Sequence, residues 1–524
     1  MTNTLSKKIN SKREIYEKYK ENFPNLDFTH KLLLDFEKED NFNFKLIIPN
    51  YLSKIENTIL VKQFCLNKIF GMLSTSSIFW EIAKYNNNKN YGIVVPASIE
   101  ILNFLKSKKI KVNYFFSLAL FFILKLKYLV SGFLFVCNFL LFNQDKKKFN
   151  NSYLFVFDIN ADAIPNSDKE LSYLNWVKKY LSQGDKIFQN KYNFRTAENI
   201  NIFYSKFNFP KPKKIFELIQ FFFSFFIYSI LFFLSLFNFK SFSAFFYRDF
   251  FESKIIDLTE KSKLAKFYIF NNVTRNYRPL WTYNPKVRNK IYYIFYGLNE
   301  FPIYFKNENK PLQNVGWSLM NWPTYIGYNK TFFDYLDLSL NHKSKKIFFN
   351  EPVWYRDNNK DDEYIKFNNN FKTIAIYDVT PINYLKNFSW TKRAEYINDR
   401  NNIIKFYNDI INITKKYNIN LIIKYKKNNR NDDNMIYDDL FVNETYLKNI
   451  IFVNSNKSPK HINSSVDAII SYPFTSAAYF NPKNLPSIYY DPASQIDIDK
   501  QINFGVPLIG NLDNLENWIR HIIQ

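Results

Sequence analysis

The C-terminal part of the chain alternates short apolar runs with longer and more polar segments, and this alternation restricts the fold more than any other feature. Over residues 371–524 the apolar runs are rich in isoleucine and tyrosine. Runs that are apolar on both faces indicate a parallel sheet covered by helices, so this region is predicted to form a Rossmann-like domain. We predict strands over 373–379, 421–425, 450–454, 467–471 and 487–491, and helices over 391–417 and 514–523.

A less regular form of the same pattern extends through the N-terminal half. It predicts a second Rossmann-like domain over residues 91–350, after a helical region over 1–90 and before a polar linker over 351–370. The fold class is therefore predicted as α/β with two Rossmann-like domains. The expected strands of this half are 91–96, 153–159, 201–205, 266–272 and 290–297, and the expected N-terminal helices are 28–39 and 69–85.

Two aromatic-rich apolar stretches, 114–142 and 215–239, are predicted to be helical insertions into this N-terminal half. The second nearly has the length that a helix needs to cross a bilayer, whereas the first contains Lys125 and Lys127, which must snorkel or face a polar cavity. Three arrangements fit: helices lying in the interface of an anionic membrane, a spanning hairpin, or buried helices. Lysines flank both stretches on every side, so the charge asymmetry of a spanning helix is missing and the interfacial arrangement is favoured. These lysines are Lys106, Lys108, Lys109, Lys111, Lys146, Lys147, Lys148, Lys211, Lys213, Lys214 and Lys240.

The net charge of +24 does not by itself predict a nucleic-acid partner. The lysine excess accompanies many Asn, Ile, Phe and Tyr residues, a bias that AT-rich codons produce, and no nucleic-acid-binding motif accompanies it. Two distant cysteines, Cys65 and Cys137, give neither a disulfide framework nor a metal site. The polar N-terminus lacks the apolar core of a secretory signal, so we expect a cytoplasmic location.

Polar residues follow the predicted strands of the C-terminal domain, where ligands bind in sheets of this kind. We predict donor-binding residues at the ends of four strands, with hydroxyl and backbone N–H groups suited to a nucleotide diphosphate and carboxylates suited to ribose hydroxyls. As an alternative, Asp378 and Asp491 cap turns before prolines, and Thr475 or Ser476 caps a helix. The predicted residues are Asp378, Thr380, Lys424, Lys426, Pro473, Phe474, Thr475, Ser476 and Asp491.

The run Pro-Phe-Thr-Ser at residues 473–476 resembles the motif of the polysaccharide biosynthesis PFTS motif family. The stretches 271–283, 296–328 and 374–384 are similar to that family as well. The resemblance implies a glycosyltransferase-like enzyme of surface polysaccharide synthesis, with a layout like the two-domain GT-B fold.

Polar and aromatic residues in the N-terminal motif stretches are candidates for an acceptor site. If the enzyme inverts configuration, a carboxylate must deprotonate the acceptor hydroxyl, and Glu300 is the candidate. The candidate acceptor-binding residues are Asn272, Arg278, Trp281, Asn299 and Trp322, with Trp281 and Trp322 expected to offer stacking faces.

We therefore expect a glycosyltransferase at the cytoplasmic face of the inner membrane, attached peripherally or monotopically. Its partners would be a nucleotide-sugar donor, a glycan or lipid-linked acceptor and an anionic membrane surface, with no cofactor and no nucleic acid. No Asp-x-Asp pair directly follows an apolar strand, so a metal-independent mechanism is expected. The alternatives are a polyol-phosphate transferase of cell-wall polymer synthesis and a non-catalytic membrane scaffold of a polysaccharide assembly complex.

Overall fold

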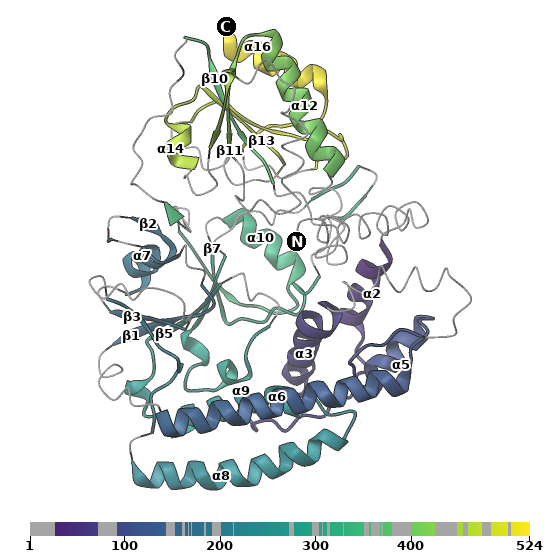
Figure 1. Ribbon diagram of the computed structural model, residues 1–524, viewed down its shortest axis with the longest axis vertical. Helices are drawn as coiled ribbons and strands as arrows, with labels where there is room; N and C mark the ends of the chain where they lie inside the picture. The colour runs from purple at the N-terminus through teal and green to yellow at the C-terminus, as the bar shows by residue number, and fades with distance from the viewer. Residues whose placement is uncertain are drawn as a thin grey trace, which may run out of the picture.

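The computed structural model contains two parallel sheets, each with its own core, in two lobes (Figure 1). This arrangement confirms the predicted α/β class with two Rossmann-like domains. The structure describes residues 27–71, 92–142, 152–159, 163–165, 167–168, 170–182, 185–190, 201–212, 214–271, 277–295, 303–306, 308–311, 315–327, 330–349, 356–357, 367, 370–379, 400–424, 448–453, 459–473, 484–500 and 505–524.

The C-terminal sheet has six strands, all parallel, in the order β12-β11-β10-β13-β14-β15. Counted along the chain this is 3-2-1-4-5-6, the order of the dinucleotide-binding Rossmann fold. Its central strands are buried along nearly their whole length, because both faces are covered. The strands are β10 (Thr373–Tyr377), β11 (Asn420–Lys424), β12 (Ile450–Val453), β13 (Ala468–Ser471), β14 (Ser487–Tyr490) and β15 (Leu508–Ile509).

Two helices cover this sheet on one side, α12 (Arg400–Lys416) and α16 (Leu512–Ile523). Asn511 caps α16 by accepting a hydrogen bond from Asn514 N (2.8 Å). The helix predicted over 391–417 is thus observed from Arg400, and residues 391–399 lie outside the described residues. A short helix, α14 (Pro459–Asn463), precedes β13.

The N-terminal sheet repeats the same order and adds a seventh strand, β4-β3-β1-β5-β6-β7-β8, again with every pair parallel. A separate antiparallel pair joins β2 (Leu171–Ser172) to β9 (Arg356–Asp357). β9 lies within the segment 351–370 that was predicted as a linker. The seven strands are β1 (Tyr153–Val156), β3 (Lys186–Gln189), β4 (Ile202–Tyr204), β5 (Phe267–Asn271), β6 (Ile291–Ile294), β7 (Thr324–Gly327) and β8 (Lys345–Phe348).

The strand predicted over 91–96 is wrong. Ile93 makes only an isolated bridge to Val112, outside the sheet. The reason is local: a Cβ on Gly92 would lie 2.7 Å from the backbone of Val112, so this segment is pressed against the chain that follows α5 (Ile99–Ser107). Four strands of the two parallel sheets that the pattern did not predict, β3, β7, β8 and β15, have only two to four residues each, and the short β2 and β9 were not predicted either.

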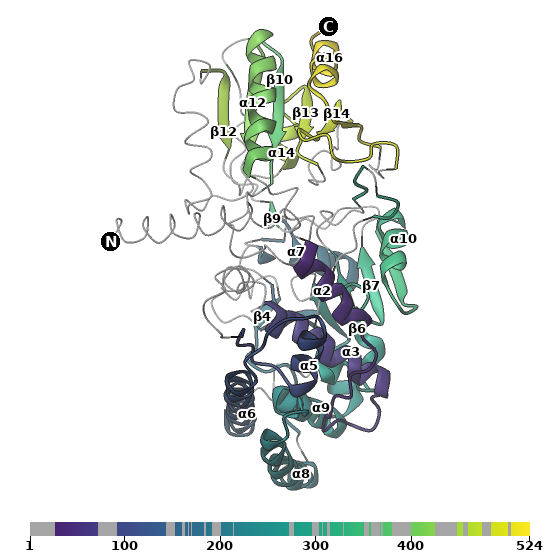
Figure 2. The ribbon, with the colours of Figure 1, turned by 90° about the vertical axis from the view of Figure 1, so that its right-hand side faces the viewer.

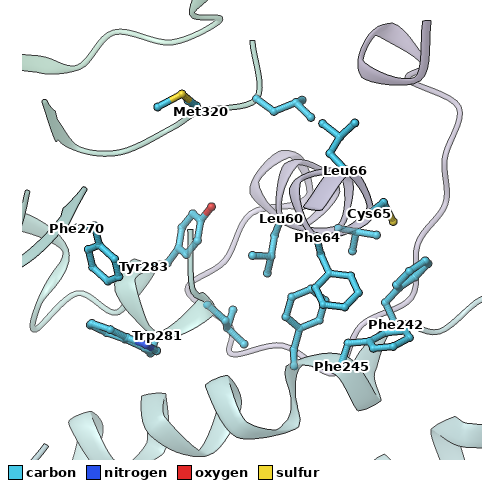
Figure 3. Packing of buried hydrophobic residues seen from close by; sticks show 14 of the residues in the cluster. Leu60, Phe64, Cys65, Leu66, Phe242, Phe245, Phe270, Trp281, Tyr283 and Met320 are labelled. Atoms are coloured by element: carbon cyan, nitrogen blue, oxygen red, sulfur yellow. The ribbon is translucent and has the colours of Figure 1, made fainter. Parts of the chain in front are cut away.

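Helices from the predicted N-terminal helical region share one core with the N-terminal sheet. In Figure 3, Phe64 of α3 (Lys54–Cys65) lies near Phe245, and their ring centroids are 4.7 Å apart. The helices around this core are α2 (Asp27–Lys38), α3 with a π-helical turn (Leu66–Phe70), α5 (Ile99–Ser107) and α10 (Lys330–Ser339). α7 (Tyr173–Val177), with a π-helical turn (Lys178–Ser182), packs in a separate cluster with Leu154 and Val156 of β1. Short 3-10 turns are η7 (Ser243–Phe246), η8 (Lys261–Lys263), η9 (Leu280–Tyr283) and η10 (Arg288–Lys290).

The two apolar stretches are helices, α6 (Tyr114–Phe142) and α8 (Ile215–Leu234), the latter continued by η6 (Ser235–Phe237). They lie along the end of the N-terminal lobe that is farthest from the C-terminal sheet (Figures 1 and 2). Both pack against α9 (Tyr247–Leu258). Each is long and apolar enough to cross a membrane, and only 22% and 17% of their most apolar windows are buried.

The two lobes join where residues 303–306 lie against the C-terminal domain. Ile303 and Phe305 are buried in the core of that domain, although they follow β6 of the N-terminal sheet. Phe305 forms an antiparallel bridge with Ile496. The chain therefore contributes a short segment of its first half to the core of its second half.

Candidate functional site

The carboxyl edge of the C-terminal sheet brings the PFTS motif to the point where the strand order reverses. β10 and β13 are neighbours although β11 and β12 lie between them in sequence, so the crevice of the sheet opens between these two strands. Tyr377 pairs with Ser471, and Tyr472 N donates to Tyr377 O (2.8 Å). Asp378 and Pro473 therefore follow two adjacent strands at the same level, and both are buried.

Lys424 lies at the same edge, one strand farther from the reversal point. It ends β11 in register with Tyr377, and it is half-buried. The structure thus brings together three of the predicted donor residues, Asp378, Lys424 and Pro473. The other predicted residues here, Thr380, Lys426, Phe474, Thr475 and Ser476, lie outside the described residues.

The end of β10 is fixed by a hydrogen bond to α14. The Tyr377 hydroxyl donates to Asn463 Oδ1 (2.6 Å), and burial raises the pKa of this tyrosine well above its usual range. The tyrosine is therefore a neutral hydrogen-bond donor at physiological pH. It holds α14 beside the strand that carries Asp378.

Asp491 follows β14 and uses both carboxylate oxygens to hold the next turn. Oδ1 accepts from Ala493 N and Ser494 N (both 3.1 Å), and Oδ2 accepts from Gln495 N (2.9 Å) and Ile496 N (3.0 Å). The side chain is 1% exposed. This geometry favours the turn-capping alternative for Asp491 over contact with a ribose.

The turn that Asp491 holds is the one on which the N-terminal lobe docks. Lys306 N donates to Gln495 O (2.8 Å), and Asp497 N donates to Tyr304 O (2.8 Å). Lys306 Nζ also donates to Ser494 Oγ (3.0 Å). Asp491 therefore shapes the contact between the two lobes at one end of the carboxyl edge.

Arg278, a predicted acceptor-binding residue, is inside the N-terminal lobe. Its guanidinium donates to Thr282 Oγ1 (3.0 Å), to Thr282 O (3.1 Å) and to Asn321 O, and it lies 3.9 Å from the centre of the Tyr283 ring. Burial lowers the pKa of Arg278 from its ordinary value. The prediction is corrected accordingly: Arg278 is buried and joins two motif stretches through their backbone carbonyls, which is a structural role rather than an acceptor contact.

The predicted stacking faces of Trp281 and Trp322 are also in the core. Trp281 is 2% exposed and packs on Phe209 and Phe270, while Trp322 is fully buried and packs on Phe270 and Tyr293. Neither ring can stack on a sugar, because aromatic neighbours already cover them. The remaining candidates, Asn272, Asn299 and Glu300, lie outside the described residues.

Glu37 is a buried carboxylate that the sequence pattern did not single out. It accepts hydrogen bonds from Gly316 N and Ser318 Oγ, and its burial raises its pKa to about 7. Charged residues surround Glu37 near the end of α2, and such a pattern is typical of an exposed helix end. The local sequence therefore did not indicate that Glu37 is buried. It fixes α2 to the motif stretch at 315–320.

Among the residues that the structure describes, no three His, Cys, Asp or Glu side chains gather in a group that could hold a metal ion. The carboxyl edge offers a buried carboxyl group of Asp378, the lysine Lys424 and the first residue of the PFTS motif, Pro473. Such a set can bind an anionic ligand through hydrogen bonds and a cation.

Comparison with known families gives one match: the family described as polysaccharide biosynthesis PFTS motif protein matches residues 221–519. This range includes β5 to β15 and the whole carboxyl edge described above. Comparison with curated proteins gives no significant match.

Solved structures with related folds are only distantly similar. HepE of Anabaena, in complex with UDP and glucose, has 9% identity and a TM-score of 0.37, over 71% of this chain and 90% of that one. An O-GlcNAc transferase of Thermobaculum terrenum has 7% identity and a TM-score of 0.34, over 72% and 61% of the two chains. The wall teichoic acid polymerase TagF has 13% identity and a TM-score of 0.32, over 76% and 91%. These similarities are too low to carry a functional argument.

Proposed function

We propose that the chain, which belongs to the polysaccharide biosynthesis PFTS motif family, is a glycosyltransferase that moves a sugar from a nucleotide-activated donor to a glycan or lipid-linked acceptor. The observation that carries this proposal is the position of the motif. Pro473 begins the motif directly beyond β13, at the reversal point of a sheet with strand order 3-2-1-4-5-6. Ligands of such sheets bind in the crevice at this point.

The chemistry of the motif suits the diphosphate of a nucleotide sugar. Thr475 and Ser476 follow Pro473 by two and three residues and supply two hydroxyl groups. Hydroxyl and backbone N–H donors stabilise the negative charge that develops on the leaving nucleotide as the glycosidic bond breaks. Lys424 adds a positive charge from the neighbouring strand β11, and Asp378 supplies a carboxylate for ribose hydroxyls. We propose that this donor set acts without a metal ion.

For the acceptor, Glu300 remains our proposed general base. Glu300 belongs to the motif stretch that follows β6 of the N-terminal sheet. Ile303, three residues later in the same stretch, is buried in the core of the C-terminal domain. This connection supports a role for Glu300 near the junction of the two domains. There it would take the proton from the attacking hydroxyl.

The proposal is tested by thermal denaturation of detergent-solubilised protein with a panel of nucleotides, for the wild type and for Thr475→Val with Ser476→Ala. We expect one nucleoside diphosphate to raise the Tm of the wild type, and the double variant to lose that shift. The matched control is Thr373→Val with Ser487→Ala, which makes the same changes at the opposite, amino-terminal edge of the sheet. This control should keep the nucleotide shift.

Folded wild-type protein that responds to no nucleotide would overturn the proposal and favour a scaffold. A nucleotide response that survives in the double variant would place the donor elsewhere. Incubation with isotope-labelled donors then identifies the transferred group. Transfer of a polyol phosphate rather than a sugar would establish the phosphotransferase alternative instead.

A further inference from the structure

We infer that α6 and α8 form an in-plane anchor that docks the N-terminal lobe on an anionic lipid leaflet without crossing it. The inference concerns the attachment surface and does not depend on the donor chemistry proposed above. Three observations carry it: the connectivity of the N-terminal sheet, the lengthwise packing of the two helices, and the distribution of exposed apolar and basic side chains.

The connectivity of the sheet excludes a spanning hairpin. β1, β3 and β4 lie between α6 and α8 in sequence, whereas β5 follows α8. If each helix crossed the bilayer, these three strands would be on the opposite side from β5. Yet β1 pairs directly with β5, from Leu154 with Phe267 to Val156 with Ile269. Both ends of α8 must therefore be on the same side of the membrane. The same holds for α6, because α3 before it shares one core with the sheet after it.

The packing of α6 gives the same result. Its buried stripe contacts the lobe along most of its length, from Phe121 against Phe242 to Phe139 against Phe207. Gly132 lies between these points, where a Cβ would come within 2.8 Å of the Tyr247 ring. A helix that lies against a folded domain in this way cannot also be surrounded by lipid across the thickness of a bilayer.

Buried hydrogen bonds hold α8 antiparallel to α6. Lys125, in the middle of α6, is fully buried and donates to Ser235 O (2.6 Å), Leu236 O (3.0 Å) and Asn238 O (3.0 Å). These carbonyls terminate α8 and η6, so the lysine caps the helix end. At the other end of the pair, Lys211 Nζ donates to Leu140 O.

The outward faces of the two helices are apolar. The exposed side chains include Phe116, Ile123, Val130, Phe133 and Leu134 of α6, and Phe216, Phe223, Phe226, Ile227, Ile230 and Phe237 of α8 and η6. Exposed apolar side chains in this number, on two helices that pack against the same helix α9, mark an interaction site. Phenylalanine-rich helices with basic ends fit the headgroup and acyl boundary of a bilayer.

The charges around this surface select an anionic leaflet. Residues 101–142 contain no acidic residue, and residues 215–248 contain only Glu217. Lys109 and Lys111 precede α6, and Lys240 follows η6. These exposed lysines belong to the same end of the helix pair, because Ile99 N of α5 donates to Phe239 O (3.4 Å). Each lysine at an anionic surface adds about fivefold to the affinity.

The inference is tested by flotation of the full-length protein with vesicles of phosphatidylcholine and phosphatidylglycerol (3:1) and with vesicles of phosphatidylcholine alone. We expect binding to the anionic vesicles that falls when only phosphatidylcholine is present. Phe226→Ser with Ile230→Ser should reduce the bound fraction about tenfold or more, because two exposed apolar side chains are removed. The matched control is Leu338→Ser with Phe348→Ser, which removes two side chains of α10 and β8 that are about as exposed as Phe226 and Ile230. This control should bind like the wild type.

All three proteins should have the same circular dichroism and Tm, since the changed residues are exposed. Equal flotation of the wild type and the Phe226→Ser, Ile230→Ser variant would overturn the inference. So would a wild type that does not float but forms a dimer that this variant abolishes, because the apolar face would then bind a second copy.

A depth measurement separates an in-plane helix from a spanning one. Fluorescent labels are attached at Phe216→Cys, Phe226→Cys and Phe237→Cys in a Cys137→Ala background, since Cys65 is buried. Quenching by lipids that carry quenchers at known depths should place all three labels at the same shallow depth. A central label much deeper than the two end labels would show a spanning helix and overturn the inference.

Discussion

The two sheets share one strand order but use the residues around it differently. The N-terminal sheet is built from aromatic strands such as Tyr-Leu-Phe-Val in β1 and Ile-Tyr-Tyr-Ile in β6, and the motif residues Arg278, Trp281 and Trp322 are buried beside it. The C-terminal sheet is built mainly from isoleucine, and its motif lies at the crevice of the carboxyl edge. The same topology therefore carries motifs of two kinds. In the first half the described motif residues hold the core together, and in the second the motif begins at the carboxyl edge, where we propose that the ligand binds.

Replacing Arg278 tests the structural half of this comparison and should have the largest effect. Arg278→Met removes the donors to Asn321 O and to Thr282 O, which lie in the interior. We expect a loss of about 3–5 kcal/mol in the free energy of unfolding, measured by urea denaturation. Arg288→Met is the control, because that guanidinium is 55% exposed and 3.8 Å from Glu56, and it should cost about 0.5 kcal/mol or less. A stable Arg278→Met variant with only a raised acceptor KM would break the comparison.

Asp491 belongs to the ligand-facing sheet but should behave like a structural residue. Asp491→Ala removes the acceptor of three backbone N–H groups, those of Ala493, Gln495 and Ile496, while Ser494 N keeps its hydrogen bond to Asp491 O. We expect a loss of about 2–3 kcal/mol by the same measurement. Asp499→Ala, at an exposed position a few residues away, should change stability little. If Asp491→Ala instead kept its stability and lost nucleotide affinity, this carboxylate would be part of the donor site.

Lys125 tests how the two apolar helices are held on the aromatic lobe. Lys125→Met keeps much of the side-chain volume but removes the donors to the three carbonyls at the end of α8 and η6. We expect a loss of about 1–2 kcal/mol and faster amide hydrogen exchange near residues 235–238. Lys127→Met, two residues away and exposed, should leave exchange there unchanged. Unchanged exchange in both variants would mean that the lysine does not hold α8.

Glu37 differs from the other three residues because its effect on stability has a defined pH dependence. Because burial raises its pKa in the folded protein to about 7 from 4.5, the folded state binds this proton more tightly than the unfolded state. Its stabilising contribution is complete below about pH 4.5 and is lost as the pH rises through about 7. Glu37→Gln does not titrate, so its stability relative to the wild type should rise steadily between pH 4.5 and pH 8, with no such gain at pH 4.5.

Parallel Tm measurements of the two proteins from pH 4.5 to 8 check this prediction. Glu37→Ala is the control for packing, because it removes the acceptors of Gly316 N and Ser318 Oγ and should be less stable at every pH. A difference between wild type and Glu37→Gln that does not change with pH would contradict the prediction.

The sequence best predicted those helices and strands that have a distinctive local pattern of residues. The five strands predicted in the C-terminal domain and its last helix are observed within a few residues, since isoleucine-rich runs between polar spacers have few other conformations open to them. The carboxyl edge could be predicted for the same reason. The burial of Arg278, Trp281 and Trp322 could not, because one residue in five is aromatic and local patterns cannot separate a core ring from an exposed one. The docking of residues 303–306 on the turn after Asp491 depends on partners nearly 200 residues apart, as in the contact of Lys306 with Ser494.

The position of α8 between the strands of the N-terminal sheet has a consequence for biosynthesis. Asn271 of the central partner strand β5 donates a buried side-chain hydrogen bond to the carbonyl of Phe157, directly after β1 and 114 residues earlier in the chain. At ribosomal rates of roughly 5–20 residues per second, β1 waits about 6–23 seconds for this neighbour. During that time α6, and later α8, emerge from the ribosome before the N-terminal sheet is complete. The nascent chain must therefore be kept from inserting these helices across a membrane, because insertion would separate β1 from β5 before the two strands can pair.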